Sequence, residues 1–312
     1  MMKITAKIRP DSTTRFAPSP TGHLHLGHVA SAIFVWGIAG SCGVRVLLRS
    51  EDHDQSRARR PYELSIFKDL AWLGLAHANT EFTALNISDF RQSDATARYH
   101  AAVAALKKSH LVYGCDCSRQ QISRETLVNQ EKILPPDLCY SGRCRTRALD
   151  LDQPGIGWRV AVEDHTQTFN DLLLGWQQQQ PARQCGDLLL RDRHGHFTYN
   201  FAVVVDDMHH GINLVIRGQD LTAATGRQLW LTAALGGNPT AMQYLHHPLI
   251  KDQKGQKLSK RIDSEGLAAR RARGESPQMV IGLAAWMIGL QKSPQPISAA
   301  DLPSLFEMVP YV

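Results

Sequence analysis

The sequence predicts an α/β protein built on a doubly wound parallel sheet. Over residues 13–110, short β-branched or leucine-rich runs alternate with segments of helical length and helical periodicity. Similar apolar runs that end in polar residues resume after residue 182. The segment between them, residues 111–181, loses this rhythm and gathers cysteines and a Pro135–Pro136 pair. These three observations indicate one sheet domain that is interrupted by an inserted subdomain.

The first block has two predicted strands and three predicted helices. TTRFAPSP is expected to be a strand that leaves into a loop, HVASAIFVWGIAG a buried helix that begins near Gly27, and VRVLLRSED a second strand. PYELSIFKDLAWLGL is expected to be an amphipathic helix with Pro61 in its first turn. DATARYHAAVAALKKSH is expected to be a third helix, with Lys107, Lys108 and His110 in the last turn, where the helix dipole favours cations.

The later block continues this pattern. GDLLLRD, FAVVVDD and NLVIRG are expected to be strand-like or buried apolar runs, and DLTAATGRQLWLTAAL and PQMVIGLAAWMIGL are expected to be helices. Ligands of open α/β sheets bind beyond the carboxyl ends of the strands. We therefore expect a domain whose halves span 13–110 and 182–250, an insertion at 111–181, and a lysine-rich loop with a short helical region at 251–312.

Composition limits the setting and the partners. The chain has 312 residues, a net charge of +6 and a pI of about 9.1, which suits a polyanionic partner such as nucleic acid. No run of 18 apolar residues exists, and the first residues, MMKITAKIRPDSTTRF, lack the apolar core of a secretory signal. We expect a cytoplasmic protein, with no membrane partner, that acts as a monomer.

The stretch RFAPSPTGHLHLGH, residues 15–28, places three histidines beside turn residues. A strand, a loop rich in proline and glycine, and then a helix start is an arrangement that binds phosphates, because the first N–H groups of the helix lack partners within it. His25 and His28 are three positions apart and are expected to face the same ligand. A metal site and a purely structural use of the histidines are the alternatives.

A second stretch, KDQKGQKLSKR, carries five cations between Lys251 and Arg261. A loop of this kind can close on a triphosphate and screen the charge that develops during displacement. A solvated lysine-rich loop is the alternative for this string taken alone.

Together these strings resemble a known family. HLHLGH with the downstream KLSKR resembles the two signatures of class I aminoacyl-tRNA synthetases, and RFAPSPTGHLHLGH, RSEDHD, TYNFAVVVDD and VIRGQDL resemble the glutamyl branch. The resemblance implies a Rossmann-type catalytic domain with an inserted acceptor-binding subdomain, and ATP with Mg²⁺ as co-substrate. Leu258 stands where the signature has methionine, Arg261 where it has its last serine, and Gln219 where the branch often has glutamate.

The resemblance also implies site residues. The glutamate pocket would contain Arg15, Phe16, Ala17, Pro18, Ser19, Glu51, Tyr199 and Arg217. ATP would be held by His25, Gly27, His28, Lys257, Ser259 and Lys260, with His25, His28 and Lys260 as the catalytic residues. Two guanidinium groups suit an amino acid with two carboxylates, and Glu51 suits its ammonium group.

The cysteines of the inserted segment indicate a zinc site. From spacing alone, CDC at 115–117 followed by CYSGRC at 139–144 suggests four thiolates. The resemblance instead implies Cys115, Cys117, Tyr140 and Cys144, so the choice between Cys139 and Tyr140 stays open. With four protein ligands such a zinc ion would be structural, because no coordination position is left for a substrate.

Only about 50 residues follow KLSKR, too few for the anticodon-binding region of a full glutamyl enzyme. This length resembles the short paralogues of the branch, the glutamyl-Q tRNA(Asp) synthetases. That resemblance implies activation of glutamate without tRNA, followed by transfer to queuosine in the anticodon of tRNA(Asp). A truncated enzyme that charges the 3′ end of tRNA(Glu), and a non-catalytic zinc- and RNA-binding paralogue, are the alternatives.

Overall fold

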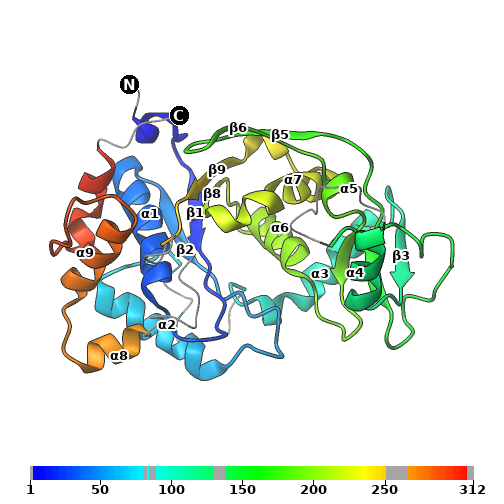
Figure 1. Cartoon of the computed structure of the whole chain (residues 1–312), viewed down its shortest axis with the longest axis horizontal. Coiled ribbons are helices and arrows are strands. Elements are labelled where there is room, and N and C mark those ends of the chain that lie inside the picture. The colour runs from blue at the N-terminus through cyan, green and yellow to red at the C-terminus, as the bar shows by residue number, and fades with distance from the viewer. Residues whose placement is uncertain (1–2, 80–82, 84–88, 129–137, 251–265, 308–312) are drawn as a thin grey trace.

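The computed structural model describes residues 3–79, 83, 89–128, 138–250 and 266–307. Residues 251–265, which carry the predicted ATP residues Lys257, Ser259 and Lys260, lie outside this set. Figure 1 shows an elongated molecule. At one end lie α8 (Leu267–Ala272) and α9 (Pro277–Met287), and at the other lie β3 (Val112–Cys115) and α4 (Arg119–Val128). Between them lie β1 (Thr13–Phe16), β8 (Leu214–Gly218) and β9 (Gln243–His247).

The first block has the predicted alternation of strands and helices. Its elements are η1 (Ile4–Lys7), β1 (Thr13–Phe16), α1 (Leu26–Cys42), β2 (Arg45–Leu48), α2 (Arg60–Leu73), η2 (Gln92–Ala95) and α3 (Thr96–Leu106). Strands β1 and β2 are parallel, with Phe16 opposite Leu48. One detail of the prediction is wrong: α3 ends at Leu106, its last buried residue, so Lys107, Lys108 and His110 follow the helix rather than form its last turn.

The second sheet has the order β6-β5-β9-β8. It contains β5 (Gln167–Asp171), β6 (Gly175–Gln179), β8 (Leu214–Gly218) and β9 (Gln243–His247). Strands β8 and β9 are parallel, but β5 and β6 form an antiparallel hairpin, so the α/β sheet is mixed rather than wholly parallel. The backbone N–H of Asn213 donates to the Thr13 carbonyl over 3.1 Å, which joins the start of β8 to β1.

A third, antiparallel sheet lies at the far end of the molecule. It consists of β3 (Val112–Cys115), β4 (Gly157–Val160) and β7 (Leu188–Arg191), near α4 (Arg119–Val128) and α5 (Pro181–Gln184). Strands β5 and β6 come before residue 181 but pair in the sheet of β8 and β9, and β7 comes after it but pairs in the sheet of β3 and β4. The division between the sheets therefore differs from the predicted end of the insertion at residue 181.

The segment FAVVVDD is a helix and not a strand. It lies in α6 (Tyr199–His209), and every residue from Phe201 to Asp207 is buried. Because the helix is covered on nearly all sides, its apolar run carries no helical periodicity that distinguishes it from a buried strand. The remaining elements of this part are η3 (Gln219–Ala224), α7 (Thr225–Ala234) and η4 (Pro239–Ala241).

The C-terminal elements pack against α1 and α2. They are α8 (Leu267–Ala272), α9 (Pro277–Met287), where a helix was predicted, and η5 (Ala299–Phe306). Both α9 and η5 contact α1, and α8 contacts α2. A Cβ atom at Gly37 of α1 would overlap the ring of Phe306, so a glycine is needed for this close approach. Among the described residues, no helix combines the length and apolar character needed to cross a bilayer.

Candidate active site

A cavity of about 440 Å³ opens where β1, β2 and β8 end and α6 begins. This position agrees with the rule that α/β sheets bind ligands at the carboxyl ends of their strands. All of the residues predicted for the glutamate pocket line it: Arg15, Phe16, Ala17, Pro18, Ser19, Glu51, Tyr199 and Arg217. Of the predicted ATP residues, His28 also lines the cavity. The sequence therefore identified a set of residues that the fold brings together from four separate segments.

The floor of the cavity is held by a buried network of charges. Arg49, which follows β2, donates to Asp207 Oδ1 over 2.7 Å and to Glu51 Oε1 over 3.0 Å. Arg15 Nε donates to the same Asp207 oxygen over 3.2 Å. Burial acts to raise the pKa of Asp207, but Arg15 and Arg49 outweigh it and hold that pKa below its ordinary value. Arg15 and Glu51 are thus fixed through Asp207 and Arg49.

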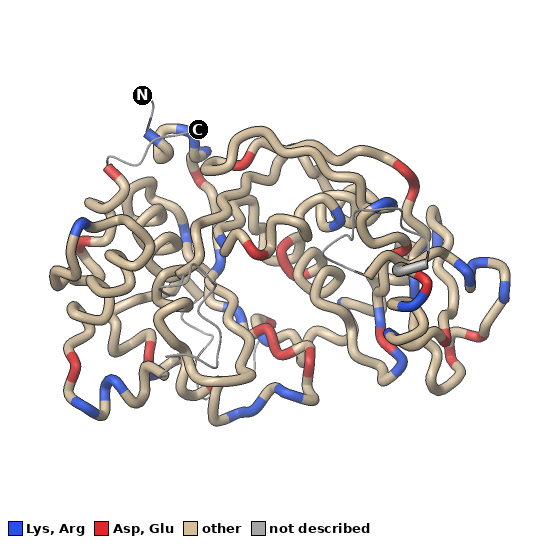
Figure 2. The backbone as a smooth tube through the Cα atoms, in the orientation of Figure 1, with Lys and Arg blue, Asp and Glu red and all other residues tan. Residues whose placement is uncertain are grey.

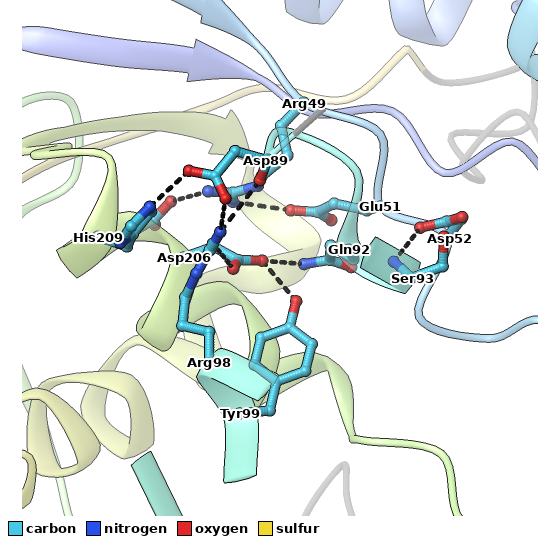
Figure 3. A network of polar contacts seen from close by, with 11 residues as sticks. Arg49, Glu51, Asp52, Asp89, Gln92, Ser93, Arg98, Tyr99, Asp206 and His209 are labelled. Carbon is cyan, nitrogen blue, oxygen red and sulfur yellow. Dashed lines mark hydrogen bonds and ion pairs between the residues drawn. The ribbon is translucent and has the colours of Figure 1, made fainter. Parts of the chain in front are cut away.

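A neighbouring network, shown in Figure 3, connects η2 and α3 to α6 behind the cavity. Asp206 accepts hydrogen bonds from Arg98 (2.6 Å), Tyr99 (2.8 Å) and Gln92 (2.9 Å). Burial raises the pKa of Asp206 despite the nearby guanidinium groups. Asp206 fixes α6, and α6 in turn carries Asp207 beneath the cavity.

Arg217 has a different environment, although it is only 5% exposed. Its three nitrogens donate to neutral atoms: Nε to His246 Nε2 (3.0 Å), Nη1 to Gln228 Oε1 (2.7 Å) and Nη2 to Thr225 Oγ1 (2.8 Å). Within the described part of the chain, Arg217 forms no ion pair. A buried guanidinium without a carboxylate partner is costly, so an anionic ligand in the cavity would be strongly favoured beside it.

Tyr199, in the first turn of α6, completes the wall between Glu51 and Arg217. Loss of solvent raises the pKa of its hydroxyl, so this group stays protonated at neutral pH and can donate or accept a hydrogen bond. The cavity therefore presents two guanidinium groups, the carboxylates of Glu51 and Asp220, and one phenol. This set complements an amino acid that carries two carboxylates and one ammonium group.

His25 and His28 form a reciprocal cap at the start of α1. His25 Nδ1 accepts from the Gly27 N–H, and His28 Nδ1 accepts from the His25 N–H, each over 3.1 Å. Because both Nδ1 atoms accept, the hydrogen of each neutral ring lies on Nε2. Gly27 is needed here, since a Cβ atom on it would lie 2.9 Å from the His25 ring. The rings can thus present N–H donors beside a helix N-terminus, as the phosphate hypothesis requires.

His23, for which the sequence suggested no role, lies outside this cap. Its Nδ1 is 3.1 Å from Ser65 Oγ, and its ring packs edge-on against Tyr62 at 5.0 Å. His23 therefore joins the loop before α1 to α2.

Three of the predicted zinc residues come together beside β3. The sulfur atoms of Cys115, Cys117 and Cys144 lie within 4.8 Å of one another. The Tyr140 hydroxyl is 3.5 Å from Cys115 Sγ and accepts the Cys144 N–H over 3.1 Å. Cys139 points elsewhere, because its sulfur lies 3.6 Å from the Arg183 carbonyl. Of the two alternatives, the geometry favours Tyr140 and not Cys139 as the fourth residue.

The environment of these sulfurs suits metal-bound thiolates. Burial raises the pKa of Cys115, but its hydrogen bonds with Tyr140 and Arg159 outweigh this effect and lower the pKa overall. Burial and the neighbouring thiols raise the pKa of Cys117 to about 12. A bound cation removes this mutual penalty, because it attracts all of the thiolates at once.

Four residues that hold the site were missed from sequence: Arg49, Asp207, Asp171 and His246. Arg49 and Asp207 lie inside the motifs RSEDHD and VVVDD, and a charged residue at the end of an apolar run is the only signal that marks them. Asp171 and His246 belong to different strands, 75 positions apart, and carry no local signal. In the part of the chain that the structure describes, Lys and Arg are spread along the length of the molecule (Figure 2).

Comparison with known proteins identifies a family whose substrates suit this cavity. Residues 12–287 match the model of the catalytic domain of class I tRNA synthetases (E and Q). A protein from Rhodobacter capsulatus named glutamyl-Q tRNA(Asp) synthetase is 36% identical over 286 residues, which cover 86% of this chain and 99% of that protein. A protein of the same name from Symbiobacterium thermophilum is 34% identical over 300 residues and is covered to 92%.

Relatives of the longer kind are also similar. A protein from Syntrophus aciditrophicus named glutamate--tRNA ligase 2 is 35% identical over 274 residues, but this chain spans only 55% of it. The crystal structure of a glutamate tRNA ligase from Elizabethkingia meningosepticum, in complex with its amino acid, superposes with a TM-score of 0.75 at 24% identity. That match covers 94% of this chain and 64% of the other, and it shows a shared fold.

Proposed function

Because the chain belongs to the class I tRNA synthetases of the E and Q type, we propose that it activates L-glutamate with ATP and then transfers the glutamyl group to queuosine at the wobble position of tRNA(Asp). The relatives that this chain covers over nearly their full length are named glutamyl-Q tRNA(Asp) synthetases. The observation that carries this proposal is the cavity at the strand ends. There Arg15 and Arg217 match two carboxylates, and Glu51 matches an ammonium group.

In the first step, the glutamate α-carboxylate attacks the α-phosphorus of ATP. The bond between the α-phosphorus and the oxygen that bridges to the β-phosphorus breaks, and pyrophosphate leaves. The N-terminus of α1 and the N–H donors of His25 and His28 suit the charge that spreads over the phosphates. Lys257, Ser259 and Lys260 lie outside the described residues, and their contact with ATP is proposed from the KLSKR signature. Mg²⁺ would neutralise phosphate charge when bound.

In the second step, a hydroxyl of the queuosine cyclopentene ring attacks the carbonyl carbon of the mixed anhydride, and AMP leaves. An acceptor that is an anticodon base requires the anticodon stem-loop itself to enter the active site. The net charge of +6 favours such a polyanionic partner.

The cluster of Cys115, Cys117, Tyr140 and Cys144 fits a structural zinc ion. Three sulfurs and one phenol oxygen are a donor set that Zn²⁺ accepts, and they come from β3, the loop after it and the segment 140–144. Zinc bound there would supply a cross-link between segments that already meet through hydrogen bonds and apolar packing. It would leave the chemistry of the cavity to the chain's own residues.

The experiment that tests the proposal has two parts. Exchange of labelled pyrophosphate into ATP, with glutamate and without tRNA, measures the first step. Transfer of labelled glutamate to tRNA(Asp) with and without queuosine measures the second. We expect exchange without tRNA and transfer only to the queuosine-containing tRNA. Transfer to tRNA(Asp) that lacks queuosine, or to tRNA(Glu), would instead support a ligase that charges a 3′ end, as the relatives named glutamate--tRNA ligase 2 suggest.

The role of Lys260 is tested separately. Lys260→Ala should lower the rate of pyrophosphate exchange while glutamate binding, measured by calorimetry, stays unchanged. An exchange rate equal to that of the parent protein would remove Lys260 from the mechanism.

A further inference from the structure

The neutral partners of Arg217 are each held in one orientation. Gln228 donates its amide N–H to Asn200 Oδ1 over 3.0 Å, so its Oε1 faces Arg217. Thr225 Oγ1 accepts from Arg217 and lies 3.2 Å from His246 Nε2. The third partner, His246, is opposite Arg217 in the register of the parallel strands β8 and β9.

The protonation state of His246 follows from its two neighbours. Its Nε2 receives the Arg217 Nε–H, and because a guanidinium can only donate, this nitrogen must offer a lone pair. Its Nδ1 lies 2.6 Å from Asp171 Oδ2, and a carboxylate can only accept, so Nδ1 carries the hydrogen. His246 is therefore a neutral ring in the Nδ1–H form, with Asp171 and Arg217 on its opposite sides.

Asp171 is fully buried and is itself fixed by the backbone. Its Oδ1 accepts the backbone N–H groups of Leu173 and Leu174, each over 2.9 Å, and its Oδ2 accepts the backbone N–H of His246 over 3.1 Å. These donors satisfy the carboxylate in place. The imidazole ring stands between it and the guanidinium, so Asp171 orients Arg217 without pairing with it.

We propose that Asp171 and His246 are positioning residues that fix Arg217 as an unpaired cation, and that this arrangement selects a ligand with a side-chain carboxylate over one with a side-chain amide. The inference rests on the proposed glutamate substrate. Arg217 has five N–H donors, of which three are used on neutral partners, which leaves one on each terminal nitrogen.

Two such donors match the two oxygens of a carboxylate. A carboxamide offers one oxygen and one NH₂ group, and its NH₂ would face a donor that cannot accept. A direct Asp171–Arg217 pair would compete with the substrate carboxylate for the same donors. The intervening ring avoids that competition and still fixes the guanidinium plane.

The test uses Asp171→Asn. The asparagine oxygen is expected to stay on the Leu173 and Leu174 N–H groups, which places its NH₂ toward His246 Nδ1. The imidazole must then accept at Nδ1 and carry its hydrogen on Nε2, where it opposes the Arg217 N–H, as in other histidines whose tautomer a carboxylate sets. The KM for glutamate in pyrophosphate exchange should rise by about 10- to 100-fold. The KM for ATP should change by less than about twofold, and the preference for glutamate over glutamine should fall.

Two further variants separate positioning from a general structural role. Asp192→Asn is the matched control, because Asp192 also accepts two backbone N–H groups and lies 3.4 Å from a histidine, His196, but does not line the cavity. It should leave both KM values unchanged. The double variant Asp171→Asn/His246→Gln should recover part of the lost glutamate affinity, since the glutamine oxygen can accept from Arg217 Nε whichever group residue 171 presents.

The outcomes are distinct. If the parent protein shows no glutamate-dependent exchange and binds no glutamate in calorimetry, the proposed function itself fails. If the parent is active but Asp171→Asn leaves the KM for glutamate within about twofold, or raises the KM for ATP equally, the positioning role is wrong. A rise confined to glutamate, with recovery in the double variant, supports it.

Discussion

Arg49 Nη1 lies 2.7 Å from Asp207 Oδ1, and this buried pair connects Arg15 and Glu51, two oppositely charged residues of the cavity. Asp207 also holds Arg15, and Arg49 also holds Glu51. The end of β2 and the helix α6 are thereby joined at a point that solvent hardly reaches, since Arg49 is 1% exposed. The placement of Arg15 and of Glu51 is therefore coupled through the Arg49–Asp207 pair.

We predict that Asp207→Asn lowers both stability and glutamate affinity. The substitution leaves the guanidinium groups of Arg15 and Arg49 buried with one carboxylate fewer, and removal of one partner from a buried ion pair costs about 3–5 kcal/mol. Denaturant unfolding measures this loss, and the KM for glutamate in pyrophosphate exchange should rise with it. Asp164→Asn is the control: its pair with Arg183 is exposed, so a change below about 1 kcal/mol is expected. Equal effects of the two substitutions would show that burial does not decide the outcome.

The fold and the cavity were largely predictable, because the signals are local. A strand, a turn-rich loop and a helix cap follow one another within residues 13–42, and their residue types specify each conformation. The cavity residues lie in motifs that mark strand ends. The conformation of α6 could not be predicted, because it has seven buried residues in succession and its sequence therefore does not distinguish helix from strand. The pairing of Asp171 with His246 depends on strand order, which local patterns do not determine.

We predict that Arg217→Lys raises the KM for glutamate at least tenfold while the protein stays folded. Lysine has one ammonium group in place of a planar fork, so it cannot satisfy His246, Gln228 and Thr225 and also present two donors to a carboxylate. Pyrophosphate exchange at varied glutamate concentration measures the change. Arg193→Lys, at an exposed site outside the cavity, should have no effect; an unchanged KM in Arg217→Lys would mean that charge alone suffices.

We predict that Cys144→Ser reduces the zinc content of the purified protein and that Cys139→Ser does not. Cys144 lies within the group of three sulfurs, whereas Cys139 faces the Arg183 carbonyl. Metal analysis after gel filtration measures the stoichiometry, which we expect to be close to one zinc per chain in the parent. Tyr140→Phe tests the fourth ligand, because it removes the hydroxyl and keeps the ring. Loss of zinc from Cys139→Ser with retention in Tyr140→Phe would reverse the assignment.

We predict that His247 makes the fold sensitive to acid. His247 is 2% exposed, its ring stacks on Phe34 at 4.8 Å, and its Nε2 has no hydrogen-bond partner among the residues that the structure describes. Burial lowers its pKa to about 4, whereas an unfolded histidine titrates near 6.5. Between these values the unfolded chain binds more protons than the folded one, so stability is lost as the pH falls from about 6.5 toward 4.

From these pKa values, the loss caused by His247 between pH 7 and pH 5 is about 2 kcal/mol. His247→Leu keeps an apolar group against Phe34 and removes the buried nitrogen without a partner, so it should lose about 2 kcal/mol less than the parent over this range. Denaturant unfolding at the two pH values measures the difference. His194→Leu, in an exposed turn, controls for the loss of a histidine from the chain. An identical acid sensitivity in the parent and in His247→Leu would mean that other groups govern it.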